Sequence, residues 1–245
     1  MKKFFALAAV AAMFIACGGN ENENEKPNGG VGNGNQTEEP APESAIKIEG
    51  NFADWAEVEV VSATLPSEGT AAYEQLKVVK VYADELYIYF YAEYDPTNIY
   101  AVDLFIDTDN DITTGCVGSD WANGLDVLMQ GGIYSWTADK TTQLEAKAYD
   151  PGANYYGGEP GTNEWNWVSA VDSGVVTSCV PVANANGDLS AIEFAVMREM
   201  IPMELGSTVA VGIIIETRGW STVGKLPQAA AEDETIPAAL VIALP

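Results

Sequence analysis

The folded part of the chain is predicted from short runs in which apolar and polar side chains alternate. Residues 100–106 place Tyr100, Val102, Leu104 and Ile106 on one face, which is the two-residue period of a strand. Residues 208–216 are apolar on both faces, as expected of a strand at the centre of a sheet. Comparable runs predict strands at Ala45–Ile48, Leu76–Tyr82, Leu86–Tyr94, Tyr100–Ile106, Leu125–Gln130, Ile133–Trp136, Gln143–Tyr149, Val175–Val182, Leu189–Val196, Thr208–Glu216 and Ala238–Leu244.

Helical periodicity is scarce between these runs. Met197–Met200, ahead of Pro202, and Gln228–Asp233 each suggest a single helical turn. Many short strands separated by Gly, Asn, Asp and Pro are typical of an antiparallel β-sandwich. The sequence therefore predicts an all-β, jelly-roll-like sandwich that forms one domain over residues 45–245.

The N-terminus has the pattern of an export signal. A basic start, Met1–Lys3, precedes the apolar run Phe4–Ala16, which is too short to span a bilayer as a helix. The run ends in Phe14-Ile15-Ala16-Cys17, which resembles the lipobox of bacterial lipoproteins. The resemblance implies that residues 1–16 are removed as a signal peptide and that Cys17 is lipidated. An ordinary secretory signal is the alternative.

Residues 17–44 are rich in Gly, Asn, Glu and Pro and have almost no apolar side chain. Such a segment cannot bury enough surface to offset its chain entropy, so we expect a disordered acidic linker. Its Asn-Glu repeat resembles the export signals of surface lipoproteins in some Gram-negative bacteria. We therefore expect a lipid-anchored outer-membrane protein on the cell surface, with a periplasmic position as the alternative.

Composition excludes several classes of function. The 245 residues include 36 Asp and Glu, 11 Lys and Arg and no histidine, giving a formal net charge of −25. Without histidine, the chain can form neither a Ser-His-Asp nor a Cys-His nucleophile. Without a basic stripe it is a poor match for nucleic acid. Carboxylates are plentiful, but none stands in a recognisable catalytic motif, so we expect a protein that is not an enzyme.

Asp107, Asp109 and Asp111 alternate at the end of an apolar strand and form the candidate metal site. Three carboxylates at this spacing repel one another unless a hard cation binds them, and Ca²⁺ takes six to eight oxygen ligands. Ile112 stands where an EF-hand requires glycine, so further ligands must come from the backbone and from elsewhere, with Asp126 as the candidate. We expect a structural calcium ion; a solvated acidic turn is the alternative.

Large aromatic side chains gather in segments rich in Gly, Asn and Pro. A flat indole ring can cover the apolar face of a sugar while Asn, Asp and Glu bind its hydroxyl groups. Asn163, Glu164 and Asn166 lie between the aromatic residues in this way. Rings that plug the open ends of the core are the alternative. The candidate ligand-binding residues are Tyr155, Tyr156, Trp165, Trp167 and Trp220.

Five motifs, in order along residues 45–245, resemble those of family 9 carbohydrate-binding modules and their DOMON-like relatives. The resemblance implies a jelly-roll-like sandwich with a binding role; related domains bind sugars and others hold haem. Glu49 replaces the aspartate that is usual in the family. The motifs are Ile48–Trp55 (I-E-G-N-F-A-D-W), Ala83–Tyr87 (A-D-E-L-Y), Phe105–Asp111 followed by Thr114-Gly115, Gly124–Asp126, and Ile192-Glu193.

The leading hypothesis is a surface-anchored lipoprotein that binds a glycan through loop aromatics. One alternative is an accessory subunit that binds a protein partner in an outer-membrane complex. Another is haem binding, which without histidine needs Met or Lys ligands such as Met129, Met197, Lys77 or Lys80. Cys116 and Cys179 could pair in an oxidising compartment, and two free thiols are the alternative.

Overall fold

A computed structural model describes residues 44–66, 71–118, 120–170, 176–231, 233 and 235–245. The predicted signal peptide, the lipidation site Cys17 and all but the last residue of the predicted linker lie outside the described residues. Within the described part, no helix is both long enough and apolar enough to cross a membrane.

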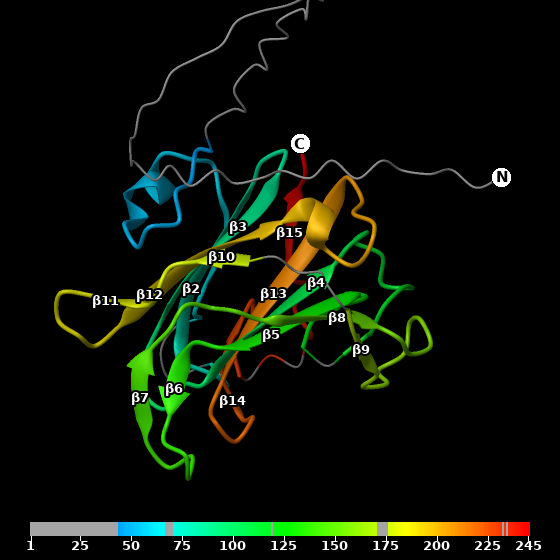
Figure 1. Cartoon of the computed structure of the whole chain (residues 1–245). Helices are drawn as coiled ribbons and strands as arrows, with labels where there is room; N and C mark the ends of the chain where they lie inside the picture. The colour runs from blue at the N-terminus through cyan, green and yellow to red at the C-terminus, as the bar shows by residue number, and fades with distance from the viewer. Residues whose placement is uncertain (1–43, 67–70, 119, 171–175, 232, 234) are drawn as a thin grey trace, which may run out of the picture. The chain divides into compact units, whose positions relative to one another are not determined.

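Two antiparallel sheets pack against each other, so the predicted all-β sandwich is confirmed (Figure 1). The first sheet has the order β1-β2-β3-β12-β10, with β11 beside β12, and the second has the order β14-β13-β4-β5-β8-β9, with β15 beside β13. The first contains β1 (Val61–Thr64), β2 (Leu76–Ala83), β3 (Tyr87–Tyr94), β10 (Val176–Ser178), β11 (Val182–Ala183) and β12 (Ser190–Met197). The second contains β4 (Ala101–Asp107), β5 (Val127–Gly132), β8 (Gly152–Tyr156), β9 (Trp167–Ser169), β13 (Thr208–Glu216), β14 (Thr222–Leu226) and β15 (Leu240–Ala243).

The remaining elements are short. A separate hairpin consists of β6 (Tyr134–Trp136) and β7 (Gln143–Ala146). The 3-10 turns η1 (Phe52–Ala56) and η2 (Arg198–Met200) are the helical elements of the described residues, and η2 forms where a turn ahead of Pro202 is predicted.

The chain passes from the first sheet to the second after β3 and again after β12 (Figure 1). Strands β3 and β12 pair in the first sheet, and the strands that follow them, β4 and β13, pair in the second. Two neighbouring strands therefore cross together from one sheet to the other, as in jelly-roll sandwiches. This crossing makes β4 and β13 central strands of the second sheet.

The core between the sheets follows from alternation along these strands. In β4, Val102, Leu104 and Ile106 point into the space between the sheets and are fully buried. In the same core, on the side of the first sheet, Phe90 of β3 stacks on its cross-strand neighbour Phe194 of β12 with ring centroids 5.0 Å apart. The apolar positions that predict the strands are therefore those that bind the two layers together.

Both outer sheet faces are also covered, which alternation alone does not predict. On the first sheet, a layer of buried residues that includes Ile46 and Trp55 packs against Tyr89 and Tyr91. The outer face of β3, formed by Tyr87, Tyr89 and Tyr91, is therefore a packed strand face. The predicted strand Ala45–Ile48 is wrong: this segment is irregular, and it lies on the sheet instead of extending it.

Glu193 of β12 holds this covering segment in place. Its side chain is buried, and Oε1 accepts hydrogen bonds from the backbone N–H of Glu49 (3.0 Å) and Gly50 (2.7 Å). Its Oε2 accepts one from the indole N–H of Trp55 (2.9 Å). Burial raises the pKa of this carboxyl, and the three donors oppose that rise. A single carboxylate thus joins the N-terminal segment to the first sheet.

Several strands outside the sheet centres escape prediction because they are short or contain residues that are unfavourable in strands. Strand β8 begins with Gly152 and contains Asn154, and β9 has only three residues. Strands β1 and β14 are likewise missing from the prediction, and Val175–Val182 is divided between β10 and β11. These strands form because a central neighbour supplies the hydrogen bonds.

The two cysteines of the described residues are free thiols. Cys116 is buried in the layer that covers the outer face of the second sheet, and Cys179 packs against the core between the sheets. Burial raises the pKa of both thiols. Of the two alternatives that the sequence leaves open, the structure has unpaired cysteines.

Glu193→Ala should lower the free energy of unfolding by about 3 kcal/mol, because it leaves three donors without their acceptor, the Trp55 indole N–H among them buried. Glu193→Gln should lose less, since its one carbonyl oxygen can still accept. Urea unfolding measures both, with the exposed Glu199→Ala as a control that should stay within about 0.5 kcal/mol of the wild type. Equal stability of all three variants would show that Glu193 does not hold the segment.

Candidate functional site

The candidate metal site begins at the last residue of β4. Alternation directs Asp107 to the outer face of the second sheet, where it is nonetheless 0% exposed. Its Oδ2 accepts a hydrogen bond from the amide of Asn123 (3.0 Å). Its Oδ1 is buried and has no hydrogen-bond partner. A fully buried carboxylate oxygen without a partner is costly unless a cation binds it.

Two further carboxylates lie beside Asp107. Asp126 directly precedes β5, which pairs with β4, and its Oδ2 accepts hydrogen bonds from the backbone N–H and the hydroxyl of Thr108, both 2.8 Å long. Asp109 is exposed on the loop after β4. One oxygen from each of Asp107, Asp109 and Asp126 lies within 4.8 Å of the others, so the three form an acidic cluster that could hold a metal ion.

Electrostatics favour a cation at this cluster. Burial raises the pKa of the Asp107 carboxyl, and the neighbouring charge of Asp109 adds to the rise. Burial also raises the pKa of Asp126, to which Asp109 and Asp107 contribute. A bound divalent ion would replace this repulsion between like charges with attraction.

Asp111 does not belong to the cluster, although the sequence places it in the candidate metal site. Its Oδ1 accepts hydrogen bonds from the backbone N–H (2.9 Å) and the hydroxyl (2.7 Å) of Thr113, and these bonds lower its pKa. This is the local turn that the sequence leaves open as an alternative. The local turn thus describes Asp111, whereas Asp107, Asp109 and Asp126 form the acidic cluster.

A second segment, residues 123–126, closes the site. A side chain at Gly124 would collide with the carbonyl oxygens of Asp111 and Thr114, so only glycine allows this close approach. Asn123 is buried, and its Oδ1 accepts a hydrogen bond from the backbone N–H of Ala239 (2.8 Å) while its amide group holds Asp107. Sequence reasoning missed Asn123, whose signal was its place directly before the Gly124–Asp126 motif.

The loop that carries the aromatic residues rests on the loop of the acidic cluster. The backbone N–H of Gly161 donates to the carbonyl of Gly115 (3.0 Å), and that of Val117 donates to the carbonyl of Thr162 (2.8 Å). The two loops therefore form one hydrogen-bonded unit. A cation that orders residues 107–117 would also order residues 157–166.

Several aromatic side chains surround Phe105 on the outer face of the second sheet. The Phe105 ring centroid lies 6.4 Å from that of Trp165 and 6.0 Å from that of Trp167, and the two indoles contact each other at 5.8 Å. Tyr156 contacts Trp167 at 5.6 Å. Trp165 is 69% exposed, whereas Trp167 and Tyr156 are half-buried. Trp165 is thus an open ring on a rigid aromatic base.

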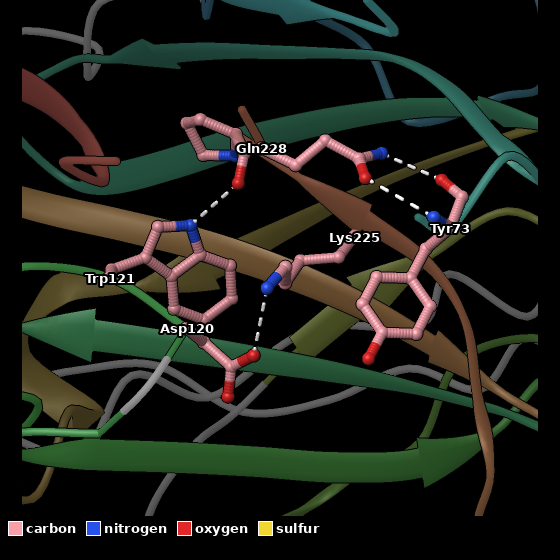
Figure 2. A network of polar contacts seen from close by, with 6 residues as sticks. Tyr73, Asp120, Trp121, Lys225 and Gln228 are labelled. Atoms are coloured by element: carbon pink, nitrogen blue, oxygen red, sulfur yellow. Dashed lines mark hydrogen bonds and ion pairs between the residues drawn. The ribbon is translucent and has the colours of Figure 1, made fainter. Parts of the chain in front are cut away.

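The base includes Trp121, which is completely buried against β13 (Figure 2). A side chain at Gly212 would collide with its ring, and its indole N–H donates to the carbonyl of Pro227 (2.9 Å). Beside it, the ammonium group of Lys225 forms an ion pair with Asp120 at 3.0 Å, as Figure 2 shows. Trp121 therefore supports the covering layer.

The same network fixes the segment after β14. Figure 2 shows the side chain of Gln228 bound to the backbone of Tyr73: its amide donates to the carbonyl (2.6 Å) and its oxygen accepts from the N–H (3.3 Å). Lys225 lies over the Tyr73 ring, 5.3 Å from its centroid. The polar groups of this network bind one another, so it is a structural element.

The structure separates the five predicted ligand-binding residues. Tyr156, Trp165 and Trp167 meet in the Phe105 cluster. The prediction of loop positions is wrong for three of them: Tyr155 and Tyr156 lie in β8, and Trp167 begins β9. Tyr155 is opposite Val127, which faces the core between the sheets, so it lies on the other side of the strand from Tyr156. Trp220 contacts Tyr100, which directly precedes the start of β4, whereas the Phe105 cluster lies near its end.

Two motifs of the family resemblance have structural roles. Asp84 accepts hydrogen bonds from the backbone N–H groups of Leu86 and Tyr87, both 2.8 Å long, and so shapes the turn before β3. Glu193 holds the segment of Ile48–Trp55, as described above. Two of the haem-ligand candidates lie apart, since Met129 is buried in the core between the sheets and Lys80 lies over the Tyr91 ring on an outer face.

A buried carboxyl that sequence reasoning missed lies midway along β4. Asp103 is buried on the outer face, and its Oδ2 accepts a hydrogen bond from Gln130 of β5 (2.8 Å). Its Oδ1 and the Oε2 of Glu216 are both buried without a partner. Burial, together with the charge of Glu216 and against the bond from Gln130, raises the pKa of Asp103 to about 7.

No family model matches the chain, and no curated protein matches it significantly. The resemblance to family 9 carbohydrate-binding modules therefore stays a prediction from the motifs.

A divalent cation should stabilise the wild type and Asp111→Asn, but not Asp107→Asn. At a concentration 100 times its Kd, a bound ion adds about 2.7 kcal/mol. Melting curves in calcium, magnesium and chelator measure the effect. In chelator, Asp107→Asn should melt above the wild type, because it removes a buried charge. Equal loss of cation stabilisation in Asp111→Asn and Asp107→Asn would contradict the assignment of Asp111 outside the site.

Asp103→Asn should stabilise the protein increasingly as the pH rises. The pKa of Asp103 is raised in the folded state from 3.8 to about 7, so its contribution is favourable at low pH and is lost as the pH rises toward 7. At about 1.4 kcal/mol per pKa unit, the variant should gain roughly 2–3 kcal/mol over the wild type between pH 5 and pH 8. Urea unfolding at both pH values measures it; a constant difference would contradict the raised pKa.

Proposed function

We propose that this protein is a non-catalytic, lipid-anchored binding protein that recognises a glycan at Trp165. The observation that carries the proposal is the 69% exposure of Trp165 on the cluster of aromatic rings around Phe105. Exposing so large an apolar ring is costly unless a ligand covers it, and the contacts with Phe105 and Trp167 hold it in place. These features support the glycan reading of the sequence.

The chemistry around Trp165 suits a sugar ring. A pyranose has an apolar C–H face that can lie on an indole and hydroxyl groups that need polar partners. Glu164 is exposed next to Trp165, and the amide of Asn166 donates to the carbonyl of Gly157 (3.1 Å), which leaves its carbonyl oxygen as an acceptor. Stacking with a few polar contacts would give modest affinity and recognition of one sugar face.

We propose that the cation is calcium and that its role is structural. The cluster supplies carboxylate oxygens from Asp107, Asp109 and Asp126, and Asp109 is open to water. Calcium accepts such an irregular set of protein and water oxygens, whereas magnesium requires stricter octahedral geometry. Through the backbone bonds from residues 115–117 to residues 161–162, the ion would brace the loop that presents Trp165.

The anchor is proposed from the sequence alone. A lipid on Cys17 followed by an acidic linker would place the sandwich at the outer membrane, with Trp165 free to meet a glycan at the cell surface. Membrane fractionation after Cys17→Ser separates this proposal from glycan binding, because loss of the anchor leaves the folded domain unchanged.

Trp165→Ala should weaken glycan binding at least tenfold, which corresponds to about 1.4 kcal/mol. A glycan array with the purified domain identifies the ligand, and calorimetry then compares variants. Trp165→Phe should retain part of the affinity because a flat ring remains. Leu86→Ala, which removes an exposed apolar side chain from the first sheet, is the control and should bind normally.

Two results would count against the glycan proposal. One is the absence of binding to any plant, host or microbial glycan by protein that is folded and loaded with calcium. The other is full affinity in Trp165→Ala. Co-purification of a membrane protein that Trp165→Ala does not disturb would favour the accessory-subunit alternative.

A further inference from the structure

We propose that Arg218, Lys147, Tyr100 and Trp220 form a second subsite, which binds a saccharide that carries a carboxylate. It lies at the start of β4, whereas the Trp165 cluster lies at its end. The strand rises by six residue steps from Ala101 to Asp107, a distance of about 20 Å. The subsite goes beyond the glycan site at Trp165 and does not require it.

The centre of the subsite is the half-buried ring of Tyr100. The guanidinium group of Arg218 lies over this ring, 4.2 Å from its centroid. Among the described residues, Arg218 forms no ion pair and its side chain donates no hydrogen bond. The cation–π contact holds the guanidinium group on the ring, and its N–H groups are available to an acceptor. A carboxylate is a planar acceptor whose two oxygens match two N–H groups of the guanidinium.

Trp220 supplies an aromatic surface at the same place. It contacts Tyr100 edge-on at 5.3 Å and is 50% exposed. It also has φ = 61°, a left-handed conformation that is rare for a bulky residue and costs about 1 kcal/mol or more. Gly219 directly precedes it without needing a positive φ. The turn between β13 and β14 therefore displays an indole at the position where glycine would fit best.

A second cation approaches from the segment after β7. A methyl group added to Gly132 would lie 3.2 Å from the Tyr100 ring and 3.5 Å from the ammonium nitrogen of Lys147, so both side chains cover this glycine. Lys147 is exposed, and among the described residues it has no ion pair. Within the described part of the chain, two cations without an ion pair therefore lie near Tyr100: Arg218 over its ring and Lys147 beside Gly132.

Two basic side chains on one small surface are unusual in a chain with so few of them. The whole chain has 11 basic residues against 36 acidic ones, yet two unpaired cations share one small surface. Lys225, in contrast, pairs with Asp120, and Arg198 donates to the carbonyl of Asp84 (2.6 Å). At physiological salt the repulsion from distant acids is screened beyond about 8 Å, so the local cations decide what binds. Ring stacking with a fixed carboxylate contact describes a uronic acid unit.

The test uses the full folded domain and tetragalacturonate as probe, with calorimetry at 0.15 M salt. Arg218→Ala should weaken binding at least tenfold. Trp220→Gly should do the same without loss of thermal stability, because glycine adopts the left-handed conformation freely. The methyl ester of the probe should also bind at least tenfold more weakly. Trp165→Ala should bind the probe normally, which separates this subsite from the proposed glycan site.

Lys140→Ala is the matched control, since it removes one exposed positive charge elsewhere on the domain. Three results would overturn the proposal: no binding of tetragalacturonate, equal weakening by Lys140→Ala and Arg218→Ala, or equal affinity for the acid and its methyl ester. Tighter binding of a sulfated tetrasaccharide than of tetragalacturonate would overturn the assignment to a carboxylate.

Discussion

Strand β4 is buried on both faces although its sequence carries an aspartate at two outward positions. The crossing of β3–β4 beside β12–β13 places it centrally, so its inner residues bind the sheets together and its outer residues must be covered. The cover consists of aromatic rings around Phe105 and of the loops that carry them. Asp103 and Asp107 thereby lose contact with water, and each keeps one oxygen without a partner. The acidic cluster and the aromatic cluster are two consequences of this single arrangement.

Much of the sandwich could be predicted, because central strands carry their own signal. Strand β4 repeats apolar residues at the two-residue period of a strand, and β13 is a nearly continuous apolar run rich in β-branched residues. Strands farther from the centre carry little of this signal: β8 contains Gly152 and Asn154, and it forms a strand between its partners β5 and β9. The strand prediction for Ala45–Ile48 is wrong for the opposite reason. Its apolar residues pack on an outer face, and periodicity does not distinguish a strand from a cover.

The candidate site shows the same limit. Asp107, Asp109 and Asp111 are equivalent in the sequence, and long-range packing distinguishes them. Asp107 is buried by the second sheet, whereas Asp111 turns toward Thr113 two residues away. Asp126 could be predicted because a motif places it at a strand start, but Asn123 depends on contacts with Ala239, 116 positions away. Local motifs thus predict which segments contribute, and tertiary contacts decide which side chains converge.

The distribution of charge along β4 gives its two ends different capacities. At Asp107 the nearby groups are carboxylates, which favour a cation, and the exposed ring of Trp165 against Phe105 favours an uncharged sugar face at the same end. Near Tyr100, Arg218 and Lys147 form no ion pair with any described residue, so the favoured ligand is an anion, and the exposed indole of Trp220 adds a flat apolar face. Between these ends, Asp103 and Gln130 fill the outer face with groups that bind each other. A ligand that spanned the strand would need a free acid at one end and a neutral ring at the other, a pattern that an acidic oligosaccharide with a neutral terminal unit provides.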